Sequence, residues 1–301
     1  MTVHIEHPQR DDQFEAWAEI IWRVEGLRFG VEELRHGVEE DPESFWGLAY
    51  LDDEPLGTGL ARASSVAGEH YGAVRVLPEH RRRGVGSALL RAVAAHTRAA
   101  GSARIWGRML AEDRDSLEFA EHRGFSIVGR ERDVVLDLTK ADVAAPEPPP
   151  GIALVSFAER PDLIRAVFAV DAELAADVPA HGAQAPMSEA EWMRENVTGP
   201  GAFLEACFVA LDGNEVVGYT AIRRFGADSP EAENRLTAVR RPWRRRGIAT
   251  ALKRAQIERA RAAGIEKIFT TNDETNVGMR GVNARLGYEP LPERIVVSGP
   301  A

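Results

Sequence analysis

One segment of this chain occurs twice, and this repeat constrains the fold more than any other feature. The first copy, AVRVLPEHRRRGVGSALLRAVAAHTRAAG, covers Ala73–Gly101, and the second, LTAVRRPWRRRGIATALKRAQIERARAAG, covers Leu236–Gly264. The same offset of 163 residues (247 − 84) relates three pairs of glycines: Gly84 and Gly247, Gly101 and Gly264, Gly124 and Gly287. A constant offset over about 50 residues indicates an internal duplication.

The length and the position of the repeat predict two domains. The chain has 301 residues, and a typical domain has about 100–200. A proline-rich stretch, Ala144-Ala-Pro-Glu-Pro-Pro-Pro-Gly151, separates the two copies and is typical of a stiff, extended linker. We therefore expect a first domain at 1–140, a linker at 141–150 and a second domain at 151–301.

Both halves show the same order of predicted elements. In each, a strand precedes two helices, a strand hairpin and a further strand, and then come a long helix, a strand, a short helix and closing strands. The long helices are expected at 84–100 and 247–263. This order predicts an α/β fold in each half, with a mixed sheet covered by helices on both faces.

Composition excludes several classes of protein. The formal net charge of −10 argues against a nucleic-acid binder, which needs a basic surface. No apolar run approaches the ~20 residues that cross a bilayer, and the N-terminus lacks the apolar core of a signal peptide. We therefore expect a cytoplasmic protein with no membrane partner. Its single cysteine, Cys207, lies in an apolar run and reads as a core residue, and no residue spacing suggests a metal site.

The repeated segment carries a glycine motif between a strand and a helix. It reads Arg-x-x-Gly-x-[Gly/Ala], as Arg81–Gly86 in the first copy and Arg244–Ala249 in the second. The first amides of a helix lack partners and carry partial positive charge, and small residues let an anion approach them. This pattern predicts a pyrophosphate cradle. The Gly-x-Gly-x-x-Gly and Gly-Lys-[Ser/Thr] patterns of other nucleotide-binding folds are absent from the sequence.

These residues resemble motif A of the GNAT acetyltransferases, and the resemblance extends through Asn276 to the Leu-Gly-Tyr ending at Tyr288. It implies a tandem GNAT protein that uses acetyl-CoA as acyl donor. The implied CoA contacts lie in both halves: Val76, Arg81, Arg82, Arg83, Gly84, Val85 and Gly86, and Val239, Arg244, Arg245, Arg246, Gly247, Ile248, Ala249 and Asn276.

The resemblance also suggests residues for the chemistry. Some GNAT enzymes have a basic Glu six residues before the strand valine, which here is Glu233, with His70 at the matching place in the first half. The family's helix-four Tyr is replaced by Asn283 and by Ala120, so the proton donor differs from the family pattern. Because the second half keeps Glu233, Asn276 and Asn283, we expect it to be the catalytic half.

The function predicted from the sequence is N-acetyl transfer from acetyl-CoA to a primary amine of a small molecule. The transfer would be direct, in a ternary complex, since no nucleophilic Ser or Cys motif supports a covalent intermediate. Two alternatives stay open: a non-catalytic CoA-binding regulatory module, and an acetyltransferase that acts on proteins or peptides. Neither nucleic acid nor a metal is expected to take part.

Several other residues are expected to be structural. Trp17, Trp22 and Trp192 lie at helical spacings that favour core packing. Asp171, Glu173 and Asp177 are expected to form a solvated acidic face.

Overall fold

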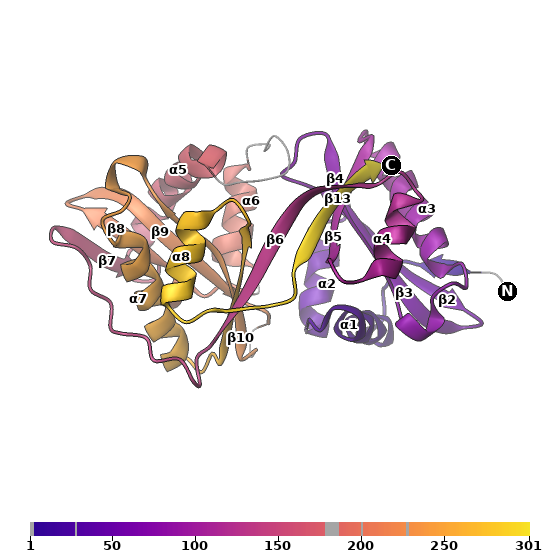
Figure 1. Cartoon of the computed structure of the whole chain (residues 1–301), viewed down its shortest axis with the longest axis horizontal. Coiled ribbons are helices and arrows are strands. Elements are labelled where there is room, and N and C mark those ends of the chain that lie inside the picture. Colours follow the sequence, from indigo (N-terminus) through magenta and orange to yellow (C-terminus); the bar gives the residue numbers. More distant parts are fainter. Residues whose placement is uncertain (1–2, 28, 178–186, 200, 227–228) are drawn as a thin grey trace. The chain divides into compact units, whose positions relative to one another are not determined.

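The computed structural model describes residues 3–27, 29–177, 187–199, 201–226 and 229–301. These residues form two compact units (Figure 1). The first unit contains the described residues up to Arg130 together with Arg294–Ala301, and the second contains those of Glu131–Glu293. Within the described helices, none is both long and apolar enough to cross a membrane.

The first unit is a mixed sheet with helices packed on it. Its elements are β1 (His4–Glu6), α1 (Asp11–Glu25), α2 (Val31–Glu40), β2 (Phe45–Leu51), β3 (Glu54–Ala63), β4 (Glu69–Val76), α3 (Val85–Ala99), β5 (Arg104–Leu110), α4 (Arg114–Glu121) and the start of β6 (Ser126–Asp137). The strand order is β1-β2-β3-β4-β5-β13. Among the described strands of this unit, β4 and β5 form the one parallel pair, because α3 returns the chain between them.

The second unit repeats this arrangement. Its elements are β7 (Ile152–Ser156), α5 (Ile164–Leu174), α6 (Glu189–Met193), β8 (Phe208–Asp212), β9 (Glu215–Arg224), β10 (Glu231–Val239), α7 (Ile248–Ala262), β11 (Lys267–Asp273), α8 (Val277–Arg285), β12 (Glu289–Pro290) and β13 (Arg294–Pro300). The sheet order is β7-β8-β9-β10-β11-β6, and β10 and β11 form its parallel pair. The predicted mixed α/β fold is therefore present in both halves.

The two halves exchange their closing strands. Most of β6, although it ends the first repeat, pairs with β11 of the second unit, from Lys267 opposite Asp137 to Asp273 opposite Glu131. The last strand, β13, pairs with β5 of the first unit, from Arg294 opposite Leu110 to Pro300 opposite Arg104. The compact units therefore differ from the sequential division that the proline-rich linker suggested. The local sequences of β6 and β13 do not indicate which of the two sheets each strand joins.

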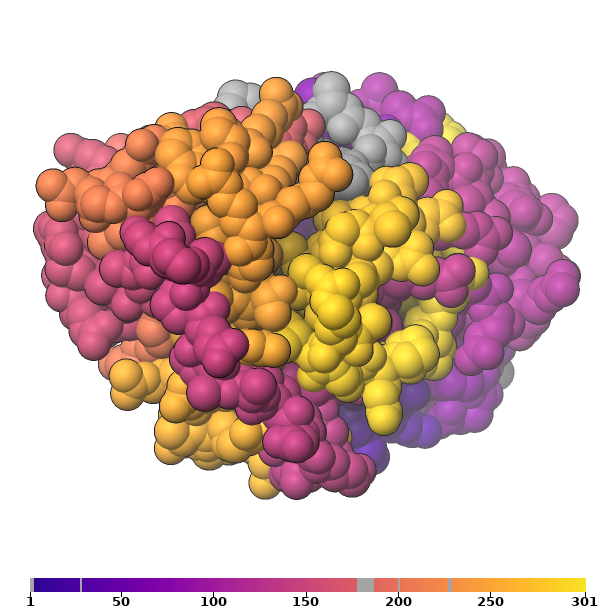
Figure 2. Space-filling view, turned by 60° about the vertical axis from the view of Figure 1, so that its left-hand side comes forward, coloured from indigo at the N-terminus to yellow at the C-terminus, as the bar shows by residue number. Residues whose placement is uncertain are grey.

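The linker follows the second unit. In Figure 1 the chain between β6 and β7 runs along the outside of α7, and Figure 2 shows it on the surface beside residues of that helix. Arg261 of α7 donates hydrogen bonds to the carbonyl oxygens of Leu138 and Ala141, at 3.3 and 2.6 Å. Pro149 reaches the glycine motif, because a Cβ placed on Gly247 would lie 4.0 Å from its Cγ.

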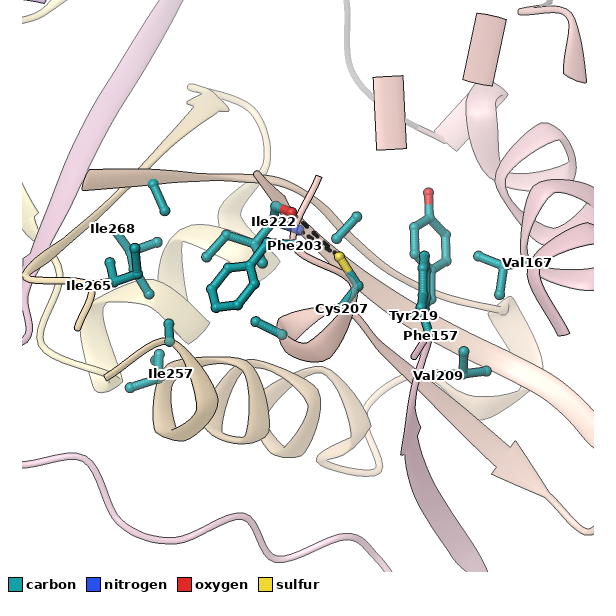
Figure 3. Packing of buried hydrophobic residues seen from close by; sticks show 14 of the residues in the cluster. Phe157, Val167, Phe203, Cys207, Val209, Tyr219, Ile222, Ile257, Ile265 and Ile268 are labelled. Carbon is teal, nitrogen blue, oxygen red and sulfur yellow. Dashed lines mark hydrogen bonds between the residues drawn. The ribbon is translucent and has the colours of Figure 1, made fainter. Parts of the chain in front are cut away.

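Most of the residues that the sequence assigned to the cores are buried. Trp17 of α1 and Trp192 of α6 are 1% and 2% exposed, as expected, but Trp22 is 44% exposed because it lies on the outer face of α1. Cys207 is buried, and its thiol donates to the carbonyl oxygen of Ile222 at 3.4 Å (Figure 3). Burial raises the pKa of this thiol to about 12, so the group stays neutral and structural.

Candidate functional site

The glycine motif has the same backbone conformation in both halves. Arg82 and Arg245 have positive φ angles of 65° and 60°, and Gly84 and Gly247 have φ angles of 89° and 88°. The glycines are the N-caps of α3 and α7, and a short 3₁₀ helix separates each of them from the preceding strand, β4 or β10. Left-handed residues before a helix turn successive amides toward one point, which favours an anion there. The duplication therefore extends to the geometry of the cradle.

In the first unit the two parallel strands separate beside the cradle. Glu69–Tyr71 pair with Arg104–Trp106. Just beyond, a Cβ on Gly107 would lie 2.5 Å from the carbonyl oxygen of Gly72, so this close approach requires glycine. The later residues of the two strands do not pair with each other, and they line a cavity of about 500 Å³. This volume is in the range of small-molecule sites.

The cavity joins the split strands to the glycine motif. Its lining includes six of the seven first-half residues that the sequence predicted: Val76, Arg81, Arg82, Gly84, Val85 and Gly86. A Cβ on Gly84 would meet no atom within 4 Å, so open space lies in front of this residue. The predicted Arg83 is exposed and contacts the ring of His80 at 3.1 Å. A pyrophosphate therefore fits the first cradle, both by its space and by its positive charge.

Asp113 connects the first cradle to α4. Its carboxylate accepts hydrogen bonds from Arg81 at 3.3 and 3.1 Å, and from the amide of Ser116 at 3.1 Å, where it caps the helix. Burial raises the pKa of Asp113, but the bonds from Ser116 and Arg81 outweigh burial and lower it. The ionised carboxylate therefore fixes the position of Arg81 at the cavity wall. Asp113 lies 163 residues before Asn276 (276 − 113), so the two residues occupy the same position in the two repeats.

A buried ion pair borders the same cavity on its other side. Glu25, at the end of α1, accepts a hydrogen bond from Nε of Arg75 on β4 at 2.7 Å. Arg75 is 8% exposed. Burial raises the pKa of Glu25, but Arg75, Arg294 and Arg108 together lower it, so the carboxylate is ionised. All four residues line the cavity, and sequence analysis identified none of them because they come from four separate elements.

In the second unit, carboxylates bind the motif arginines. Asp177, in the short 3₁₀ helix after α5, is ion-paired with both Arg241 and Arg244. Nε of Arg244 also donates to the carbonyl oxygen of Val239 at 2.8 Å. Hydrogen bonds from Arg241 and Arg244 hold the pKa of Asp177 far below its usual value. Asp177 therefore neutralises part of the positive charge beside the second glycine motif.

The neighbouring acidic residues are also engaged, so the expected solvated acidic face was wrong. Glu173 accepts two hydrogen bonds from Arg240, at 2.9 and 2.6 Å. Asp171 accepts a hydrogen bond from the hydroxyl of Tyr219, which lies in the core (Figure 3). Burial raises the pKa of Asp171 more than its hydrogen bonds lower it.

The strands of the second unit also separate, but polar side chains fill this region. Glu231–Glu233 pair with Lys267–Phe269, and β10 then contains a bulge between Asn234 and Leu236. The hydroxyl of Thr270 donates to the carbonyl oxygen of Asn234 at 3.0 Å. Asn234 also donates to Thr220 at 3.1 Å. These hydrogen bonds hold the start of the split together.

The two catalytic residues predicted in the second half come from different elements, Glu233 from β10 and Asn283 from α8. Glu233 accepts a hydrogen bond from Nε of Arg223 at 2.9 Å. Asn283 is 2% exposed and lies inside the unit, on α8. Asn276 caps α8 by accepting from the amide of Met279 at 3.2 Å. Of the other predicted contacts, Val239 and Ile248 are buried, Ala249 is half-buried, and Arg245, Arg246 and Gly247 are exposed.

Comparison with known proteins identifies the family. The sequence profile of the "Acetyltransferase (GNAT) family" matches residues 11–125 and 173–288, which is more than half of the chain. The chain belongs to the GNAT acetyltransferase family. A search of curated proteins finds no match to this chain.

Solved structures show the same fold in tandem GNAT proteins. A GCN5-related N-acetyltransferase from Sphaerobacter thermophilus is similar with a TM-score of 0.79 and 19% identity, over 99% of this chain and 95% of that one. A tandem GNAT protein from the clavulanic acid biosynthesis pathway has a TM-score of 0.74 and 19% identity, over 99% and 98%. A putative acetyltransferase from Pyrococcus horikoshii has a TM-score of 0.62 and 14% identity, over 99% and 89%. At these identities the likeness concerns the fold.

Proposed function

We propose that this GNAT protein is an acetyl-CoA-dependent N-acetyltransferase whose first unit binds the acyl donor. The observation that carries the proposal is the cavity of about 500 Å³ that joins the split between β4 and β5 to the Arg81–Gly86 cradle. The acceptor would be a primary amine of a small molecule.

The shape of the cavity suits an acyl-CoA. The cradle amides and Arg81 would hold the pyrophosphate at the N-terminus of α3. The pantetheine arm would follow the edge of β4 from Val76 to Val74, where peptide groups face β5 across the split. The thioester would then lie near the closed end of the split, at Gly72 and Gly107.

The chemistry requires little from the protein beyond position and polarity. The amine attacks the thioester carbonyl in its neutral form, so a proton must leave it through water or a side chain. An amide of the split strand would stabilise the oxyanion of the tetrahedral intermediate. The C–S bond then breaks, and the thiolate of CoA takes up a proton. Cys207 takes no part, because it is buried and neutral.

The two catalytic residues predicted in the second half remain predictions. For Glu233 to act as a base, its ion pair with Arg223 would have to open first. Asn283 would have to act from inside the unit. The cavity that the donor would occupy lies at the first cradle. The reaction is therefore proposed for the first unit, although the sequence favoured the second.

A titration and a transfer assay test this proposal. Acetyl-CoA is titrated into the intact protein in a calorimeter, and release of the CoA thiol is then measured with a panel of small amines. We expect saturable binding and thiol release with at least one amine. Absence of binding would refute the donor assignment. Binding without any transfer would favour the alternative predicted from sequence, a CoA-binding regulatory module.

A further inference from the structure

Charged residues from both faces of the sheet line the cavity of the first unit. Side chains alternate across a strand, so Val76 and Arg75 of β4 point to opposite faces of the sheet. Val76 lies on the α3 face, since its Cγ2 would be 3.5 Å from a Cβ on Gly86. Arg75 lies on the α1 face, where it binds Glu25. The donor's pyrophosphate would occupy the α3 face, which leaves the α1 face for the acceptor.

Three arginines and one glutamate line the cavity on the α1 face. Arg75 comes from β4, Arg108 from β5 and Arg294 from β13, and Glu25 ends α1. The three guanidinium groups lie near enough to Glu25 to lower the pKa of its carboxyl against the effect of burial. This arginine cluster contrasts with the chain as a whole, whose formal net charge is −10.

Each guanidinium can serve more than one partner. It has five N–H donors in a planar arrangement that matches a carboxylate or a phosphate. Glu25 is bound through Nε of Arg75, which engages one of those donors. The guanidinium carbon of Arg108 also lies over the ring of Tyr71, 6.0 Å from the ring centre. The cluster can therefore accept an additional oxyanion while the Glu25 ion pair stays in place.

Building on the proposed function, we propose that the acceptor is an amine that also carries an oxyanion, a carboxylate or a phosphate, and that Arg75, Arg108 and Arg294 bind this group. The oxyanion would hold the acceptor on the α1 face while its amine reaches the thioester in the split. A polyamine or another acceptor with only positive charges is disfavoured there, because three guanidinium groups repel it.

Arg294 makes this specificity depend on the far end of the sequence. Figure 1 shows β13 beside β5 in the first unit, and Arg294 pairs with Leu110, which also lines the cavity. The pairing uses backbone atoms, so a substitution of the Arg294 side chain leaves the strand in register. Arg294 is therefore a specificity-determining residue that the second repeat provides to the site of the first.

Matched pairs of acceptors test the proposal. Thiol release is measured for α-amino acids against the corresponding amino acid amides, and for phosphoethanolamine against ethanolamine. Titration of acetyl-CoA beforehand shows separately whether the donor binds. We expect kcat/KM to be at least about tenfold higher for the anionic member in one of the two series. The series in which this occurs distinguishes a carboxylate from a phosphate.

Variants of Arg294 locate the effect. Arg294→Gln should raise KM for the anionic acceptor by about 10- to 100-fold, while kcat and the KM for its neutral partner change little. Arg294→Lys should restore part of the preference. Arg98→Gln, an exposed arginine on α3, is the matched control and should change neither constant.

The opposite results would overturn the proposal. Equal kcat/KM for anionic and neutral members of both series would do so, as would equal effects of Arg294→Gln on both members of a pair. Transfer only to cationic amines, or no transfer to any member of the panel while acetyl-CoA still binds, would also contradict it. Failure of acetyl-CoA to bind would instead refute the proposed function on which this inference rests.

Discussion

The two cradles of this protein have nearly the same backbone but different surroundings. In the first unit, Arg81 is held at the cavity wall by Asp113, and the space before Gly84 is open. In the second unit, Arg244 is bound to Asp177, and Pro149 of the linker lies beside Gly247. A conserved loop geometry after duplication is therefore compatible with two different uses. The contacts of neighbouring segments, and not the motif, distinguish the halves.

The interiors of the two units also differ, in the polarity of matching buried residues. Five buried polar residues of the second unit occupy positions that are apolar in the first. At the offset of 163 residues, Lys253, Gln256, Asn272, Asn283 and Tyr288 correspond to Leu90, Val93, Met109, Ala120 and Phe125. Buried polar groups without partners lower stability. At these five positions the second unit buries polar groups that the first does not, so the comparison can be tested through stability as well as through ligands.

The largest expected effect concerns Lys253. Its side chain is fully buried, its Nζ has no hydrogen-bond partner among the described residues, and it lies 4.7 Å from the ring centre of Tyr288. Burial lowers the pKa of Lys253 from 10.5 to about 7. At 1.36 kcal/mol per pKa unit this corresponds to a cost of about 5 kcal/mol at low pH. Lys253→Met should recover much of it.

The lowered pKa of Lys253 determines how the free energy of unfolding changes with pH. Between pH 7 and 10.5 the unfolded chain binds more protons at Lys253 than the folded one, so the free energy of unfolding rises with pH. The gain from Lys253→Met should therefore be largest at or below pH 7 and smallest above pH 10.5. Denaturant unfolding of the second unit at several pH values measures it. Lys267→Met, at a half-exposed lysine, is the control and should show no such trend. A gain independent of pH would contradict the assignment.

The next effect concerns the cradles themselves. Gly84→Glu places a carboxylate in the open space where the pyrophosphate would bind, and should weaken acetyl-CoA binding at least about 100-fold. Gly247→Glu should leave that binding unchanged, since its cradle already faces Asp177. Calorimetry gives both affinities. Gly84→Ala has the same unfavourable φ of 89° without the charge, and so separates backbone strain from repulsion. Loss of binding in Gly247→Glu alone would reverse the comparison.

Much of the fold could be predicted from sequence because it rests on local patterns. The repeat offset, the glycine motif and the order of helices and strands are local features, and the sequence predicted them. The strand exchange was not, since β6 and β13 have the same alternating pattern whichever sheet they join. Strand partners depend on the whole chain and not on the strand itself.

The candidate site shows the same limit. The cradle of Arg81–Gly86 follows from a contiguous motif, and the structure places it at the cavity. Glu25, Arg75 and Arg294 meet there from three distant segments, so no spacing in the sequence relates them. The ion pairs of Asp177 were missed for a similar reason, because the arginines they bind lie 64 and 67 residues further along the chain. The sequence identified the chemistry of the site, but not the side chains that modify it.

The smallest effect, which sharpens the comparison most, concerns Asp177. Asp177→Asn removes the carboxylate that binds Arg241 and Arg244, so the second cradle becomes more positive. In a Gly84→Glu background, where only the second cradle can respond, acetyl-CoA affinity should rise about three- to tenfold. Asp162→Asn removes a carboxylate that pairs with Arg160, outside the motif, and should leave the affinity unchanged. If both substitutions have the same effect in calorimetry, Asp177 does not control the second cradle, and another segment must account for the difference between the halves.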